Sequence, residues 1–117
     1  MANDNFHATR TEYHGLLQQL TDCTLTCEAC ATACLNEENV SMMARCIELD
    51  RDCADICSLG ARLIQRDAEI ADTYLSLCAT MCRMCAEECA KHNDEHCKRC
   101  ASVCQATANA CDAVAAE

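Results

Sequence analysis

The sequence predicts an all-α protein, an antiparallel up-down four-helix bundle with a cysteine-lined core. Its 117 residues include no Pro, two Gly, two Tyr, one Phe and no Trp. A β-rich domain needs more turn-forming, aromatic and β-branched residues than this composition supplies. Ala, Leu, Glu and Arg, which favour helices, are plentiful instead. The length suits one domain rather than two, and we expect residues 1–117 to form a single bundle.

Short polar segments separate four stretches with helical spacing of apolar residues. We therefore expect helices over about 5–35, 41–65, 68–92 and 94–115. The first ends at the polar run 36–39. Ser41 is expected to cap the second helix, Asp67 the third, and Asn93 or Asp94 the fourth. Connections this short join antiparallel neighbours, which gives the up-down topology.

The cysteines repeat at steps of three, four or seven residues in all four predicted helices. These steps place them on one stripe of each helix, and in a bundle that stripe faces the common axis. The fifteen are Cys23, Cys27, Cys30, Cys34, Cys46, Cys53, Cys57, Cys78, Cys82, Cys85, Cys89, Cys97, Cys100, Cys104 and Cys111. Charged residues between them, such as Glu88, are expected to face solvent or a neighbouring subunit.

Cysteine thus occupies the positions where leucine and isoleucine ordinarily fill a bundle core. A cysteine side chain is smaller than leucine, and unfilled core volume costs about 24 cal/mol per Å³. One or two such residues would be ordinary small core residues. A core built from fifteen thiols would be badly underpacked, so we expect it to hold something else.

The two ends of the cysteine stripes differ. At one end the stripes continue into an expected plug: Tyr13, Leu16, Leu20, Gly60, Ile64, Ala71, Leu75 and Val114. At the other end they meet Met43 and His92, with Met42 and His96 beside them. We expect these four side chains to line a mouth through which metal enters. Histidines near helix ends also serve as caps, and methionines as gap fillers, so these roles stay open.

Asp50 lies on the stripe of the second helix, between Cys46 and Cys53. A carboxylate is unexpected among thiols. Two interpretations fit it equally well. It is either an auxiliary oxygen ligand or hydrogen-bond partner of the innermost metal sites, or a capped or water-bridged polar residue.

Thiolate ligands select Cu(I), Zn(II) or iron–sulfur clusters. Burying unpaired charge is prohibitive, and one Cu(I) per thiolate cancels the charge, whereas Zn(II) with four thiolates leaves a net charge of about −2. Iron–sulfur ligands usually come from cysteine runs in loops, followed by Pro. The CxxC pairs here lie inside helices with further cysteines at both flanks: Cys27–Cys30, Cys82–Cys85 and Cys97–Cys100.

The sequence therefore predicts storage or buffering of multiple Cu(I) ions, and no enzyme. Zinc or general heavy-metal sequestration of the metallothionein type is the alternative, and iron–sulfur electron transfer is a weaker one. The net charge of −10 argues against nucleic acid and anionic membrane surfaces as partners. No export signal and no apolar stretch of about 20 residues is visible, so we expect a cytoplasmic protein with reduced thiols.

Residues 23–111 resemble the cytosolic branch of the bacterial copper storage proteins. Four segments carry the resemblance: CTLTCEACATAC, CIELDRDCADIC, LCATMCRMCAEEC and HNDEHCKRCASVC. The resemblance implies a homotetramer of bundles, each holding many Cu(I) ions that enter at the His- or Met-bearing mouth. Besides the ions, we expect a copper chaperone as partner. The chain has somewhat fewer cysteines than some cytosolic members, so the resemblance does not give the stoichiometry.

Overall fold

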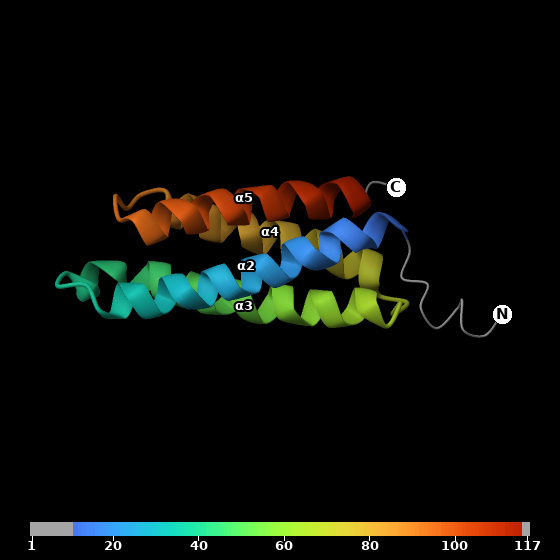
Figure 1. Ribbon diagram of the computed structural model, residues 1–117, viewed down its shortest axis with the longest axis horizontal. Helices are drawn as coiled ribbons and strands as arrows, with labels where there is room; N and C mark the ends of the chain where they lie inside the picture. Colours follow the sequence, from blue (N-terminus) through green and yellow to red (C-terminus); the bar gives the residue numbers. More distant parts are fainter. Residues whose placement is uncertain (1–10, 116–117) are drawn as a thin grey trace.

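Four long antiparallel helices make up the computed structural model, which describes residues 11–115 (Figure 1). They are α2 (Thr11–Leu35), α3 (Ala44–Gln65), α4 (Ala71–Cys89) and α5 (Glu95–Ala115), and the short 3₁₀ helix η1 (Val40–Met43) precedes α3. Each helix packs against the next, and α5 packs against α2, which closes a ring. The predicted all-α up-down bundle is confirmed. Residues 5–10 of the first expected helix lie outside the described residues.

Two of the expected helix caps are wrong. Ser41 lies inside η1, and α3 begins only at Ala44. Asp67 has a positive φ of 54° and ends α3 instead of starting α4. The backbone N–H groups of Asp67 and Ala68 donate to the carbonyls of Ile64 (3.1 Å) and Leu63 (2.9 Å). This is the Schellman arrangement, in which the residue after the helix turns left-handed.

The connection from α4 to α5 also differs from expectation in detail. Helix α4 ends at Cys89, three residues before the expected His92. The N–H groups of Lys91 and His92 donate to the carbonyls of Glu88 and Cys89, each at 3.1 Å, so the chain tightens into turns there. Asp94 does precede α5, as expected, because its carbonyl accepts the N–H of Lys98 at 3.0 Å.

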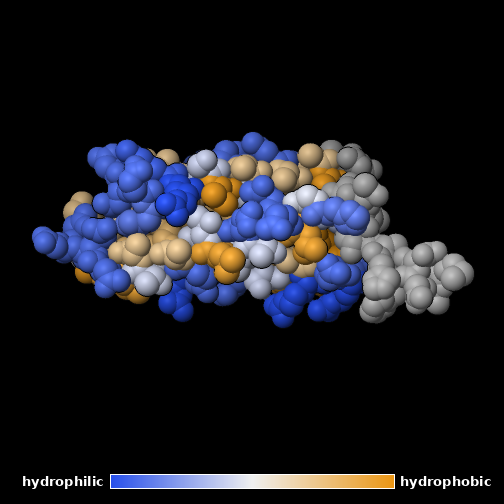
Figure 2. Space-filling model, in the orientation of Figure 1, coloured by the Kyte–Doolittle hydropathy of each residue, from blue (hydrophilic) through white to orange (hydrophobic). Residues whose placement is uncertain are grey.

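The cysteine stripes face the centre of the ring. All fifteen cysteine side chains are buried, with at most 1 % of their surface exposed. The outer surface is mostly polar on the face shown in Figure 2, with apolar side chains in scattered patches. No helix within residues 11–115 is long and apolar enough to span a bilayer.

The expected apolar plug closes the end of the bundle at which α2 begins. Tyr13, Leu20, Ile64 and Leu75 are buried there, each at most 1 % exposed. The Tyr13 hydroxyl donates to Oδ1 of Asp72 at 2.5 Å, which joins the first turns of α2 and α4 across this end. The plug therefore combines packed apolar side chains with a hydrogen bond between two helices.

Gly60 lies where the plug meets the cysteines, and a Cβ atom there would crowd its neighbours. It would stand 3.0 Å from Sγ of Cys78 and 3.3 Å from Cε2 of Tyr74, whereas a Cβ at Gly15 would meet nothing within 4 Å. We expect Gly15→Ala to raise the free energy of unfolding by roughly 0.5–1 kcal/mol, because alanine is the better helix former. Gly60→Ala has the same gain in helix propensity, but overpacking should lower its free energy of unfolding by about 1–3 kcal/mol relative to that gain.

Urea unfolding of the reduced apo-protein measures both variants. Equal gains at the two positions would contradict the close packing at Gly60.

Candidate metal centre

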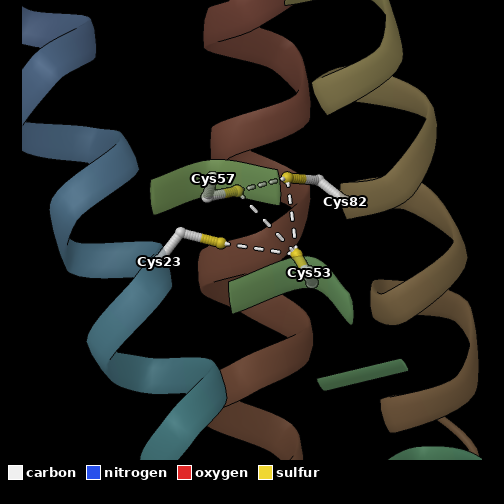
Figure 3. A group of neighbouring side chains, drawn as sticks. All are labelled: Cys23, Cys53, Cys57 and Cys82. Atoms are coloured by element: carbon white, nitrogen blue, oxygen red, sulfur yellow. Dashed lines mark hydrogen bonds between the residues drawn. The ribbon is translucent and has the colours of Figure 1, made fainter. Parts of the chain in front are cut away.

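The sulfur atoms form one continuous column along the bundle axis, which we call the thiol column. Figure 3 shows a section of it, where Cys23 of α2, Cys53 and Cys57 of α3 and Cys82 of α4 point toward one another. Sγ of Cys82 lies 3.5 Å from that of Cys57 and 3.8 Å from that of Cys53, and the Cys23 and Cys53 sulfurs are 3.9 Å apart. Each sulfur thus meets sulfurs from neighbouring helices.

Groups of four ligand atoms, all within 4.8 Å of one another, follow each other along the column. They include Cys23/Cys53/Cys57/Cys82, Cys23/Cys27/Cys53/Cys104, Cys27/Cys85/Cys100/Cys104, Cys30/Asp50/Cys89/Cys100 and Cys30/Cys34/His96/Cys97. Consecutive groups share members. A shared thiolate can bridge two metal ions, so the arrangement suits a chain of linked sites rather than separate ones.

The spacing of the sulfurs already suits metal coordination. With metal–sulfur bonds of about 2.3 Å, two sulfurs on one metal lie about 3.8 Å apart in a tetrahedral site and about 4.0 Å apart in a trigonal one. Many neighbouring sulfurs along the column have such separations, for example 3.5 Å for Cys27 and Cys104 and 4.0 Å for Cys30 and Cys34. Metal binding therefore requires only small adjustments.

The thiols are free, and none of the fifteen is joined in a disulfide. A disulfide bond is about 2.05 Å long, far shorter than these separations. Burial, with the neighbouring Cys46 thiolate adding repulsion, raises the pKa of Cys34 to about 12. Without metal such a thiol keeps its proton at neutral pH, and a binding metal must displace it.

Cys78 and Cys111 form the end of the column nearest the plug. Sγ of Cys78 lies 3.7 Å from the carbonyl oxygen of Ile56. The adjacent Cys111 thiol, together with burial, raises the pKa of Cys78. Next to this pair, Thr107 replaces a cysteine on the α5 stripe. Its hydroxyl donates to the carbonyl of Val103 at 2.7 Å and accepts from Gln19 at 2.9 Å, so it is a packing residue.

Asp50 is fully buried in the middle of the column. Its Oδ1 accepts hydrogen bonds from the thiols of Cys85 and Cys100, each at 3.2 Å, and from the thiol of Cys89 at 3.5 Å. Burial raises the pKa of Asp50 to about 10, and electrostatic repulsion from the Cys100 and Cys85 sulfurs adds to the shift. In the metal-free protein this carboxyl is therefore neutral and hydrogen-bonded to thiols, while a role as oxygen ligand stays a prediction.

His96 faces the thiol column at its mouth. Its Nδ1 lies 3.5 Å from Sγ of Cys97, 3.6 Å from that of Cys30 and 3.9 Å from that of Cys34. Its Nε2 lies 3.0 Å from Oε2 of Glu37. One ring nitrogen thus points at sulfur and the other at a carboxylate, an arrangement common in metal sites.

His92 lies at the same end but faces a different group. Its Nε2 lies 3.0 Å from Oε2 of Glu88, whose Oε1 lies 3.4 Å from both Arg45 and Lys91. The expectation that Glu88 faces solvent is wrong, since only 7 % of its surface is exposed. The side chains of Arg45, Lys91 and His92 surround the Glu88 carboxylate. The sequence does contain a signal for the His92–Glu88 contact, because a Glu and a His four residues apart on a helix can interact. The interpretation of the cysteine pattern did not use it.

The two expected mouth methionines are separated. Met43 is fully buried and belongs to the core, while 72 % of Met42 is exposed. Because η1 turns them in opposite directions, they do not form one pair of ligands. The sequence interpretation also missed Glu37, which contacts His96 fifty-nine positions away along the chain.

The fold and this column of shared thiols define a helical bundle built to hold several soft metal ions. A family model described as "Copper storage protein" matches residues 9–116, and the chain belongs to this family.

Two copper storage proteins and one further cysteine-rich protein are similar to this chain. The Cu(I)-bound copper storage protein BsCsp3 of Bacillus subtilis has 36 % sequence identity and a TM-score of 0.87, over 90 % of this chain and 99 % of that one. A cytosolic copper storage protein from Streptomyces lividans, loaded with five coppers, has 34 % identity and a TM-score of 0.89, over 94 % and 97 %. The uncharacterized cysteine-rich protein YhjQ of Bacillus subtilis is 41 % identical over 61 residues, 52 % of this chain and 56 % of its own length.

The raised pKa of Asp50 predicts how the stability of the metal-free protein depends on pH. The carboxyl ionises near pH 4 when unfolded and near pH 10 when folded, so unfolding releases a proton between these values. Its stabilising contribution is complete below pH 4 and is lost as the pH rises toward 10. We expect Asp50→Asn to abolish this loss, which amounts to about 1 kcal/mol per pH unit.

Urea unfolding of reduced apo-protein at pH 5, 6 and 7 tests this expectation. The difference in unfolding free energy between wild type and Asp50→Asn should fall steadily with pH. A constant difference would mean that Asp50 is ionised in the folded protein.

Proposed function

We propose that the protein stores or buffers many Cu(I) ions in the cytoplasm on the thiolates of its fifteen cysteines. The single observation that carries this proposal is the unbroken thiol column, in which consecutive four-atom groups share their sulfurs. Its similarity to a Cu(I)-bound and a cytosolic copper storage protein supports both the metal and the compartment. No turnover of a substrate is part of this function.

The charge of the column favours Cu(I) over Zn(II). A fully deprotonated column in a buried axis needs close to one positive charge per sulfur, because unpaired buried charge is costly. One Cu(I) per thiolate supplies it. Zinc would need tetrahedral groups that each leave negative charge. Bridging reduces that excess without removing it, and the titration below distinguishes copper storage from metallothionein-like zinc sequestration.

Copper uptake is assigned to the mouth. His96 has 23 % of its side chain exposed, and its Nδ1 lies within 3.9 Å of three buried sulfurs. At the opposite end, the packed plug and the Tyr13–Asp72 hydrogen bond leave the bundle closed. A copper ion arriving at His96 meets Cys97, and from there sulfur groups continue inward.

We further propose that bundles associate as a homotetramer and exchange copper with a chaperone. Leu77 and Met84 lie seven residues apart on the same side of α4, and 52 % and 41 % of them are exposed. Covering such apolar side chains in a subunit interface would be favourable. The mass of the protein in solution, measured by light scattering, tests the tetramer.

Anaerobic titration of reduced apo-protein with Cu(I), against a chromophoric Cu(I) chelator, tests the storage function. We expect about one copper per cysteine to bind before the chelator colours. A sharp end point at about four zinc ions, with weaker copper retention, would favour zinc sequestration. A brown protein with visible charge-transfer bands would favour an iron–sulfur protein.

Replacing His96 should slow uptake without changing capacity, because the thiol column remains intact. We expect His96→Ala to lower the rate of Cu(I) transfer from a chelator by about tenfold. His14→Ala is the matched control, since His14 is an exposed histidine at the plug end of α2. Stopped-flow absorbance measures both rates. Equal slowing in the two variants, or a halved copper capacity in His96→Ala, would refute uptake at the mouth.

A further inference from the structure

We propose that Glu37 is a positioning residue for copper uptake, which holds the His96 ring so that Nδ1 presents a free lone pair to Cu(I). This inference rests on the proposed storage function and concerns how its first site is prepared. Among the ligand group Cys30, Cys34, Cys97 and His96, only His96 is appreciably exposed. The state of this ring therefore decides what an arriving copper ion encounters.

Glu37 is well placed for this role because its backbone contacts Cys34 and its side chain contacts His96, two members of this ligand group. It lies in the turn that follows α2, where its N–H donates to the carbonyl of Cys34 at 3.2 Å. Its side chain reaches Nε2 of His96, in the first turn of α5, at 3.0 Å. Glu37 thus joins the end of α2 to the beginning of α5 beside the thiols that both helices contribute.

The contact with Glu37 selects one tautomer of His96. An ionised carboxylate only accepts hydrogen bonds, so Nε2 carries the proton in this contact. In a neutral imidazole the lone pair is then on Nδ1, the nitrogen that faces sulfur. The opposite tautomer would place an N–H against the thiols and leave no lone pair for copper on that side.

The distances from Nδ1 suit a metal ion between the ring and the sulfurs. With bonds of about 2.0 Å to nitrogen and about 2.3 Å to sulfur at a trigonal angle, nitrogen and sulfur lie about 3.7 Å apart. The three distances are 3.5, 3.6 and 3.9 Å, to Cys97, Cys30 and Cys34. The ring therefore already has the orientation that a mixed nitrogen–sulfur site requires.

The second carboxylate–histidine pair at the mouth provides an internal contrast. Glu88 is shared between His92, Arg45 and Lys91, so its charge is already balanced. Within residues 11–115 the His92 ring contacts Glu88 and no thiol. The ion pair between Glu88 and Arg45 ties α4 to the beginning of α3. Among the residues that the structure describes, only the Glu37–His96 pair connects a carboxylate to the thiol column through an imidazole.

The experiment compares three single variants near Glu37, in the full chain, and adds His96→Ala with and without Glu37→Ala. Glu37→Ala removes the acceptor, and Glu37→Gln retains an oxygen that can accept from Nε2–H. Glu38→Ala is the matched control, because Glu38 is the exposed neighbour in the same turn and its loss changes the charge equally. Two quantities are measured: the His96 tautomer in reduced apo-protein, by long-range ¹H–¹⁵N NMR, and the rate of Cu(I) transfer from a chelator.

Glu37→Ala should lose the pure Nε2–H signature of His96 and slow copper uptake by about tenfold. Copper capacity should be unchanged. Glu37→Gln should retain both the signature and most of the rate, and Glu38→Ala should alter neither. In a His96→Ala background, Glu37→Ala should cause no further slowing.

Three results would overturn the proposal. These are an unaltered tautomer in Glu37→Ala, equal slowing by Glu38→Ala, or additive slowing in the double variant. The tautomer is read from metal-free protein, so it decides the positioning role even if the copper titration contradicts storage.

Discussion

The structure depends on one constraint: four helices must bring small, soft side chains to the same axis at matching depth. Steps of three and four residues keep each cysteine stripe facing inward, and antiparallel neighbours bring sulfurs within 3.5–3.9 Å of one another. Thiols fill less volume than leucine and contribute less apolar burial, so the metal-free bundle gains less from its centre than an ordinary bundle does. The plug and the helix connections must supply the remaining cohesion. Ions that bind only the folded column would add stability in proportion to their affinity, which couples metal storage to folding.

The polar groups inside the bundle are arranged around protonated thiols. Within residues 11–115 no buried side-chain nitrogen or oxygen lacks a hydrogen-bond partner. Asp50 is neutral because burial disfavours its charged form and raises its pKa. An ionised carboxylate in its place would be stable only beside positive charge. Asp50 therefore marks the depth at which an arriving cation changes the local electrostatics most, since both the carboxyl and the thiols around it can then release protons.

Much of the fold was predictable because the cysteines alone mark the inward-facing positions of all four helices. The cysteine stripes predicted the bundle, its axis and the plug, since seam positions repeat locally along each helix. The errors fell where long-range contacts or turn geometry decided the outcome. Asp67 is a good N-cap by composition, but its left-handed φ of 54° serves the end of α3. The sequence pattern predicts Glu88 as a surface residue, but in the structure Arg45 from the neighbouring helix covers it. Met42 and Met43 are adjacent in sequence, and only the 3₁₀ turn separates an exposed side chain from a buried one.

The two ends of the bundle meet opposite physical demands. A storage column must retain its ions against loss, so at the plug end apolar packing and the Tyr13–Asp72 hydrogen bond exclude water. It must also exchange ions, which requires partly exposed ligands of intermediate softness. The mouth has these features: its connections are short turns, and both histidines there are hydrogen-bonded to carboxylates from Glu37 and Glu88. An imidazole binds Cu(I) less firmly than several bridging thiolates do, so an ion caught by His96 is favoured to move inward. With uptake at His96 as proposed, the change from nitrogen to sulfur ligands along the axis would give the up-down bundle a single direction for filling.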